Sequence, residues 1–145
     1  AIIGILAAVG VVAYNGYTSG AKKNASIANF KNVSKYISNE VIKCTMGESK
    51  AMSGNLDCSK QGSNNWDDVV IDATLLALTD FKNPWNSTGS PITKGRQYWY
   101  DKDVGYIRIM SHSKTQVEVW VCAITPCGSK PNPNVYDNLV TIYGM

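Results

Sequence analysis

The chain opens with an apolar segment and continues as a polar one. Residues 1–13 are Ala, Ile, Leu and Val apart from two glycines, and the first charged side chain is Lys22. A run of this length falls short of the roughly 20 residues that a membrane-spanning helix needs. A soluble domain does not require so apolar a start, so we expect this segment to be buried against lipid, other helices, or both.

Small residues recur four positions apart in this segment, at Gly4 and Ala8 and again at Gly16 and Gly20. Such spacing lets helix backbones approach closely in lipid-like surroundings, and it disfavours a helix in the core of a globular domain. The remainder of a secretory signal is a further alternative, but that class predicts a break after a cleavage site. Here the helical pattern continues instead.

A one-sided apolar stripe extends the helix into the polar part of the chain. Its members follow three- and four-residue spacing, with Ser34 filling the missing turn; they are Ile27, Phe30, Ile37, Val41 and Cys44. We expect one helix from about Ala1 to about Met46, ended near Gly47, with a length of about 70 Å. A chain of 145 residues cannot cover such a rod, so something other than this chain must bury its N-terminal half.

The region after this helix is predicted to form a head that begins with a loop. Residues 47–62 contain Gly, Ser, Asn and Lys throughout, which is typical of loops. Asn65 or Asp67 is a candidate cap for a short helix over residues 68–78. A turn is predicted at residues 81–86.

Strands are predicted in the second half of the head. Residues 97–100 and 104–110 are expected to pair as a hairpin through residues 101–103. Residues 117–121 alternate between apolar and other side chains, and residues 139–143 are a candidate last strand.

Two prolines, Pro131 and Pro133, keep residues 128–134 irregular between these last strands. The whole pattern predicts an α+β fold, in which the C-terminal half of the long helix packs on an antiparallel sheet. The candidate head core consists of Phe30, Ile37, Val41, Ile107, Ile109, Val117, Val119 and Val121.

The N-terminal residues carry a specific resemblance. Ala1-Ile-Ile-Gly-Ile-Leu-Ala-Ala-Val9, followed by Ala13-Tyr-Asn-Gly-Tyr17, resembles the N-terminal helix of bacterial type IV pilins and of the related type II secretion pseudopilins. In that family the mature chain opens with a methylated Phe and an apolar run that contains one Glu. The resemblance implies about ten further residues ahead of Ala1, which would bring the apolar stretch to a membrane-spanning length.

The resemblance implies an inner-membrane precursor that an assembly machinery packs into a helical filament at the cell surface. N-terminal helices then form the filament core and the heads its outer surface, so neighbouring subunits bury the protruding helix. The expected division is a protruding segment, residues 1–26, and a pilin head, residues 27–145. The residues expected to pack in the filament core are Ile2, Ile3, Gly4, Ile5, Leu6, Ala8, Val9, Gly10, Val12, Ala13, Tyr14 and Tyr17.

The chain departs from the family at Val12, where many pilins have a Pro that marks a stretch of helix unwound in the filament. Pro disfavours a helix interior by about 3 kcal/mol and Gly by only about 1 kcal/mol. Gly4 and Gly10 are the available weak points here. We therefore expect any unwinding in the filament to lie between Gly4 and Val12.

Charge is unevenly distributed over a chain of net charge +3. Residues 1–43 contain five Lys against Glu40, and the remainder contains nine basic and ten acidic residues. The lysines are expected to form a solvated helix face. Lys22 and Lys23, just past the apolar run, are placed to meet lipid headgroups or acidic patches of neighbouring subunits.

The four cysteines are Cys44, Cys58, Cys122 and Cys127, and their spacing lacks a zinc-type pattern. An even number in a non-cytosolic chain indicates disulfides, for which three pairings exist. Sequence alone does not choose among these. We favour Cys44–Cys58 and Cys122–Cys127 because local pairs need no particular long-range geometry, and the family often closes a C-terminal loop in this way.

Candidate chemistry in the head is sparse. The lone His112 is predicted to lie in a polar turn between two strands and to be solvated, and no catalytic, cofactor or phosphate-binding pattern is evident. The Phe81-Lys-Asn-Pro-Trp-Asn86 motif resembles a loop that binds calcium in some pseudopilins, with Asn83 and Asn86 where carboxylates would be expected.

Surface recognition is equally weakly indicated. The mixture of basic and aromatic residues near Arg96 and Tyr98 is too slight to predict a nucleic-acid site. Pilins can carry O-linked sugars, and residues 87–90 are an accessible candidate for such a glycan.

The leading hypothesis is a structural subunit of a type IV pilus rather than an enzyme, with adhesion, motility or DNA uptake as properties of the filament. A pseudopilin that forms a short periplasmic pseudopilus is the alternative, which the Pro-Trp motif favours. A membrane-tethered binding module that does not polymerise is a third hypothesis, but it leaves the pattern of residues 1–17 unexplained.

Overall fold

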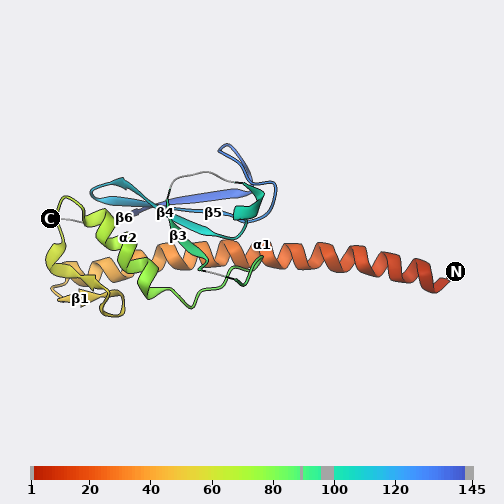
Figure 1. Ribbon diagram of the computed structural model, residues 1–145, viewed down its shortest axis with the longest axis horizontal. Coiled ribbons are helices and arrows are strands. Elements are labelled where there is room, and N and C mark those ends of the chain that lie inside the picture. Colours follow the sequence, from red (N-terminus) through yellow and green to blue (C-terminus); the bar gives the residue numbers. More distant parts are fainter. Residues whose placement is uncertain (1, 89, 96–99, 143–145) are drawn as a thin grey trace.

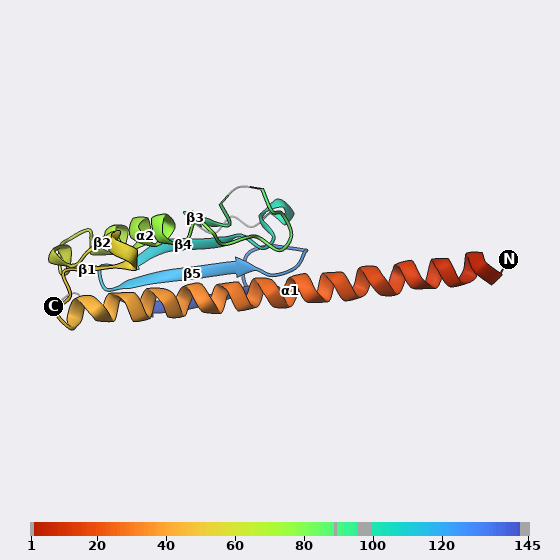
Figure 2. The same cartoon turned by 90° about the horizontal axis from the view of Figure 1, so that it is seen from below.

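A long helix runs along the head and extends beyond it in the computed structural model (Figures 1 and 2). The structure describes residues 2–88, 90–95 and 100–142, with the backbone alone for residues 2–13. Helix α1 is continuous over Ile2–Thr45. It stops before Gly47, whose φ of 95° is a left-handed conformation that Gly adopts at little cost. The prediction of a single helix that ends near Gly47 is confirmed.

The main sheet has four strands in the order β3-β4-β5-β6. Their bounds are β3 Ile92–Lys94, β4 Ile107–Ser113, β5 Gln116–Cys122 and β6 Val135–Thr141. Strands β4, β5 and β6 are antiparallel neighbours, whereas β3 lies parallel to β4. The predicted α+β class is therefore confirmed, although the sheet is mixed at its β3 edge rather than wholly antiparallel.

Helices α1 and α2 pack on one face of this sheet. Helix α2 spans Trp66–Ala77 and contacts β3 and β4, while α1 contacts β5 and β6. The alternation along β5 directs Val117, Val119 and Val121 into the shared core, and all eight predicted core residues are buried. A smaller cluster of Trp120, Cys122 and Val135 lies apart from that core.

The segment after α1 is more ordered than predicted. Strand β1, Lys50–Ala51, pairs with β2, Leu56–Asp57, and the short 3₁₀ turns η1 (Met52–Gly54) and η2 (Cys58–Lys60) follow them. The prediction of a plain loop over residues 47–62 is wrong here, because Met52 and Leu56 are fully buried in the core. The polar residues around them, such as Ser53, Asn55 and Asp57, hide these two apolar residues in the sequence pattern.

Helix α2 begins two residues earlier than predicted, at Trp66. Asn65 occupies the N-cap position, although its side chain makes no capping hydrogen bond. Asp67 lies inside the first turn rather than at the cap, and its carboxylate accepts a hydrogen bond from the hydroxyl of Ser111 in β4. The carboxylate therefore joins α2 to the sheet.

The predicted hairpin between residues 97–100 and 104–110 does not appear in the described residues, in which strand β4 begins only at Ile107. The two neighbours of β4 are β3 and β5, which pair with it over Ile107–Ile109. Residues 101–103 form the 3₁₀ turn η3, Asp101–Asp103, because the Asp103 carboxylate accepts a hydrogen bond from the Tyr100 amide at 3.0 Å. Residues 97–99 lie outside the described residues.

Two strand ends also differ from the predictions. Strand β6 starts at Val135, four residues before the predicted start, and Tyr143 lies outside the described residues. His112 belongs to the end of β4 rather than to a turn, and its side chain is exposed. The irregular stretch predicted between β5 and β6 agrees with the structure, in which residues 128–134 contain no helix or strand.

Candidate functional site

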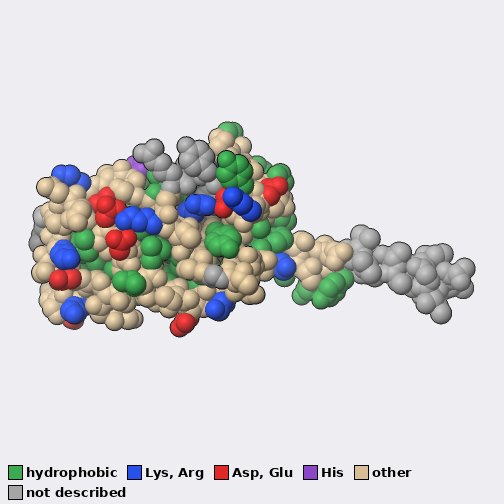
Figure 3. All heavy atoms as spheres, viewed as in Figure 1, with side chains coloured by type: hydrophobic (Ala, Val, Ile, Leu, Met, Phe, Trp, Pro, Cys, Tyr) green, Lys and Arg blue, Asp and Glu red, His purple; other side chains and the backbone are tan. Residues whose placement is uncertain are grey.

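The part of α1 beyond the head presents aromatic side chains to solvent. Tyr14 is 68% exposed and Tyr17 is 77% exposed. Figure 3 shows hydrophobic side chains on the projecting helix next to the point where it leaves the head. Burying an aromatic side chain removes a large apolar area from water, so these two rings favour a contact that this chain alone does not supply.

The two glycines beside these rings are not needed for packing within the chain. A Cβ atom added at Gly16 or at Gly20 would have no neighbouring heavy atom within 4 Å. The intervening Thr18 satisfies its own hydroxyl, which bonds to the carbonyls of Tyr14 and Asn15 at 3.1 and 3.0 Å. The small residues therefore leave open space along the helix, as a closely packed neighbouring helix requires.

The remaining residues predicted for the filament core lie on the first turns of α1. The backbone is helical from Gly4 to Val12 in this single chain. The prediction of unwinding concerns the filament and stays a prediction, and the side chains of residues 2–13 lie outside the described ones. A search of the described helices finds none with the length and apolar character of a membrane span.

The junction between helix and head is built around Trp85. The ammonium group of Lys22 lies 5.4 Å from the centre of the Trp85 ring, within the range of a cation–π contact. One turn further along, Ser26 is fully buried and donates a hydrogen bond of 3.0 Å to the Lys22 carbonyl. The amide of Asn29 donates to the carbonyl of Lys82 at 3.1 Å. Contacts with the loop that contains Lys82 and Trp85 thus hold helix α1 against the head from Lys22 onward.

Residues 81–86, here called the Pro-Trp loop, are held in turn by the end of the sheet. The Trp85 indole N–H donates to the carbonyl of Ala123 at 3.1 Å, and the Trp85 amide donates to Asn83 Oδ1 at 2.9 Å. Asn83 Nδ2 donates to the carbonyl of Val104 at 3.0 Å. Close approach is possible because residue 105 is Gly: a Cβ there would lie 2.0 Å from Asn83 Oδ1.

These contacts give Asn83 a structural role that the sequence did not reveal. Both ends of its buried amide are engaged within the chain, so it is not free to face a cation. Within the described ranges, no group of three or more His, Cys, Asp or Glu side chains is placed to hold a metal ion. The resemblance of this loop to a calcium-binding one therefore finds no support in its geometry.

Both predicted disulfides are confirmed. Cys44 and Cys58 join the end of α1 to η2 with a Cα–Cα distance of 5.0 Å. Cys122 and Cys127 close a short loop after β5 with a Cα–Cα distance of 5.8 Å. The Cys127 amide donates to the Asp101 carboxylate at 2.8 Å, which ties this loop to η3.

Several charged groups have partners that sequence reasoning missed. Arg108 and Asp103 form a largely buried ion pair of 2.8 Å beside η3. On the other side of the head, Lys94 lies 3.0 Å from both Asp72 and Asp68 of α2. The hydrogen bonds that the Lys94 ammonium group donates to these two carboxylates, the one to Asp72 first, raise the pKa of Lys94. These pairs join residues five to 26 positions apart, and nothing in local spacing marks them.

The candidate glycan segment and His112 were both predicted to lie at the surface, and their described residues are exposed. The hydroxyl of Thr88 donates to Asn86 Oδ1 at 2.6 Å in a local turn, while Ser87 is exposed. The exposed His112 ring has Nδ1 4.0 Å from the Glu118 carboxylate across the β4–β5 pair. Neither residue is part of a larger polar cluster in the described part of the head.

Comparisons of the chain with protein-family models, with curated proteins and with solved structures find no significant match.

Proposed function

We propose that the chain is a structural subunit that polymerises into an extracellular helical filament of the type IV pilus kind. The observation that carries the proposal is the single helix over Ile2–Thr45, whose N-terminal part leaves the head with Tyr14 and Tyr17 exposed. In a filament core made of such helices, neighbouring subunits bury these exposed side chains. Every subunit offers the same surface to its neighbours.

Two further features agree with this proposal. The head contains two disulfides, and disulfides form and persist in oxidising compartments outside the cytosol, as an extracellular subunit requires. The open space at Gly16 and Gly20 suits close approach by helices of other copies. Adhesion, motility and DNA uptake would be properties of the assembled filament, and the inner membrane and assembly machinery would be its partners before assembly.

The experiment is shearing of surface material from bacteria that express the full-length chain, followed by electron microscopy and mass identification of the subunit. The proposal expects long filaments made of this chain, and none from a variant that lacks residues 1–21 but retains both disulfides. Short assemblies confined to the periplasm would favour a pseudopilin. A monomer in detergent, without filaments of any length, would overturn polymerisation as the function and favour a tethered binding module.

Two substitutions distinguish an effect on the projecting helix surface from a general effect of altered surface charge. Tyr17→Lys places a charge on the surface that the filament core would bury, and it is expected to abolish filaments because an unpaired buried charge is costly. Lys60→Glu, at an exposed site in η2, alters charge without touching the projecting helix and should leave assembly intact.

A further inference from the structure

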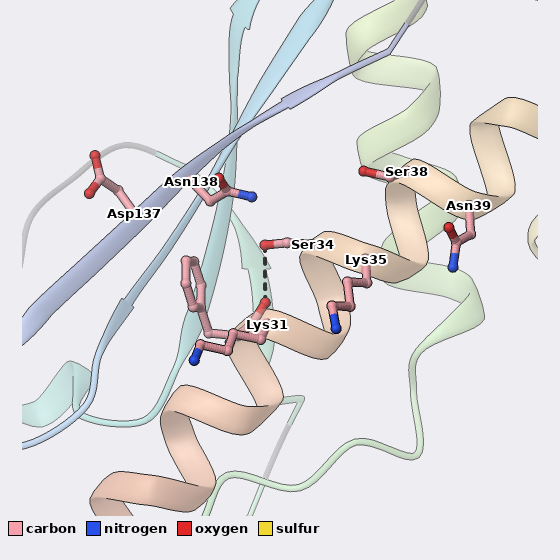
Figure 4. Close-up of a pocket in the computed structure, with 8 residues that line it drawn as sticks. Lys31, Ser34, Lys35, Ser38, Asn39, Asp137 and Asn138 are labelled. Carbon is pink, nitrogen blue, oxygen red and sulfur yellow. Dashed lines mark hydrogen bonds between the residues drawn. The ribbon is translucent and has the colours of Figure 1, made fainter.

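A cleft of about 370 Å³ opens between α1 and the edge strand β6 (Figure 4). Ser34 and Ser38 point from the helix toward the strand, and Asn138 points back from β6. Lys31 and Lys35 are exposed and project from α1 along its rim. The Phe30 side chain also lines the cleft, and the Ser34 hydroxyl donates to the Phe30 carbonyl at 3.1 Å. The cleft is thus a trough of mixed polar and apolar character with two positive charges beside it.

Nothing in the described part of the head neutralises this rim. Asp137 is the acidic residue of the cleft lining, but it turns away in Figure 4 and forms its ion pair with Lys130. Among the described strands, β6 has β5 as its neighbour in the four-stranded sheet, and its residues Asp137 and Asn138 line the cleft.

The opposite edge of the head carries the complementary charge. On α2, Asp68, Asp72 and Leu76 follow four-residue spacing and form a ridge, with side-chain exposures of 51% and 61% for the two carboxylates. Lys94 bonds to both carboxylates, which leaves one negative charge uncompensated. Acidic and basic side chains lie side by side over α2 in Figure 3. Because α2 covers β3 and β4 while α1 covers β5 and β6, ridge and cleft lie toward opposite edges of the head.

We infer that the cleft of one copy receives the α2 ridge of a second copy in the filament. Lys31 and Lys35 are one helical turn apart, as are Asp68 and Asp72, so both pairs have side chains about 6 Å apart. Cleft and ridge are two different surfaces toward opposite edges of the head. They make a head-to-tail contact, which repeats along an open helical assembly.

This contact depends on the proposed function, because it is a contact between heads in a filament. Electrostatic complementarity selects the second copy as the occupant, since basic rim and acidic ridge belong to the same chain. The contact fixes the position of each head relative to its neighbour, in an assembly whose largest buried surface lies in the helical core.

Zero-length carbodiimide cross-linking of assembled filaments tests the contact, since it joins Lys and Asp side chains that already touch. Filaments are assembled from a mixture of ¹⁴N- and ¹⁵N-labelled chains. We expect isotopically mixed peptides that join Lys31 or Lys35 to Asp68 or Asp72. The Lys94–Asp72 link, formed within one chain, reports that the chemistry worked. Recovery of that link without the mixed peptides would overturn the inference.

Charge reversal gives a second readout. K31E/K35E and D68K/D72K should each lower the fraction of chain in filaments about tenfold, the change that about 1.4 kcal/mol of lost contact free energy produces. The four substitutions together should restore assembly. The matched controls K50E/K60E and E48K/D80K reverse the same number of charges at other exposed positions and should assemble normally.

The two proposals fail in different ways. If the unaltered chain forms no filaments, the proposed function is wrong. If the unaltered chain forms filaments and the reversed variants assemble like their controls, only the cleft contact is wrong. A quadruple variant that stays defective while both single-surface variants fold normally, as judged by circular dichroism, also contradicts the pairing.

Discussion

The indole N–H of Trp85 donates a hydrogen bond of 3.1 Å to the carbonyl of Ala123, 38 residues later in the chain. The same ring lies 5.4 Å from the ammonium group of Lys22. One side chain therefore joins the exit of α1, the Pro-Trp loop and the end of β5. In the proposed filament this junction sets the direction in which each head leaves the helical core.

Removing this ring should loosen the junction. Trp85→Ala is expected to lower the free energy of unfolding by about 3 kcal/mol, since it empties a half-buried site. Trp85→Phe should cost about 1 kcal/mol because it keeps most of the ring but leaves the Ala123 carbonyl without its donor. Lys22→Ala should cost less than about 1 kcal/mol. Urea unfolding followed by circular dichroism measures all three, and a Trp85→Ala variant as stable as the unaltered chain would refute the role of the ring.

Gly105 is required where the Pro-Trp loop meets the sheet. Its φ is +77°, and an added Cβ would lie 2.0 Å from Asn83 Oδ1 and 2.7 Å from a Trp85 ring carbon. Gly105→Ala is expected to destabilise the head by about 3 kcal/mol or more, because steric overlap adds to backbone strain. Gly54→Ala is the control, with φ of +91° and open space around it, and should cost only about 1 kcal/mol. Equal losses for the two variants in thermal melts would contradict the predicted overlap.

The two disulfides should differ in their contribution to stability. The chain-entropy account gives about 3 kcal/mol for the Cys44–Cys58 pair, which closes the longer loop, and about 2 kcal/mol for Cys122–Cys127. Paired Cys→Ser variants measured by differential scanning calorimetry compare these values. Loss of Cys44–Cys58 should also expose the β1–β2 segment to proteolysis, and a larger effect from the shorter loop would count against this account.

The Asp57 carboxylate provides a local pH dependence. It accepts hydrogen bonds from the Ser59 hydroxyl at 2.7 Å and the Ser59 amide at 3.1 Å, which lower the pKa of Asp57 in that order. A carboxyl whose folded pKa is depressed stabilises the fold above its unfolded pKa of about 3.9, and this contribution is lost as the pH falls through the folded pKa.

An NMR titration of the Asp57 carboxyl carbon should therefore give a midpoint below about 3.9. The Ser59 amide should shift with the same midpoint, and Asp57→Asn should abolish that coupled shift. A midpoint at or above the ordinary value would show that the two hydrogen bonds do not form in solution.

Local pattern was sufficient to predict the elements whose residues repeat over several turns. The stripe from Phe30 to Cys44 identified the buried face of α1, and Gly47 marked its end. The alternation of Val117, Val119 and Val121 identified β5. Both disulfides followed from loop proximity.

The predictions of secondary structure and of the site failed where side chains form hydrogen bonds, ion pairs or packing contacts that no local sequence pattern indicates. Asp103 shapes residues 101–103 into η3 and pairs with Arg108, and β4 begins at Ile107 rather than at the predicted residue 104. Strand β6 begins early because Val135 packs beside Trp120, although residues 136–139 show no alternation. The junction at Trp85 depends on contacts across long sequence separations, which no period or motif encodes.

The central claim is that other copies of this chain bury the projecting half of α1. A cryo-electron microscopy map of filaments sheared from expressing cells tests it most directly. The account predicts heads on the outside, residues 1–21 packed along the axis, and Tyr14 and Tyr17 enclosed by neighbouring helices. A filament in which these residues face solvent, or surface filaments that do not contain the chain, would contradict it.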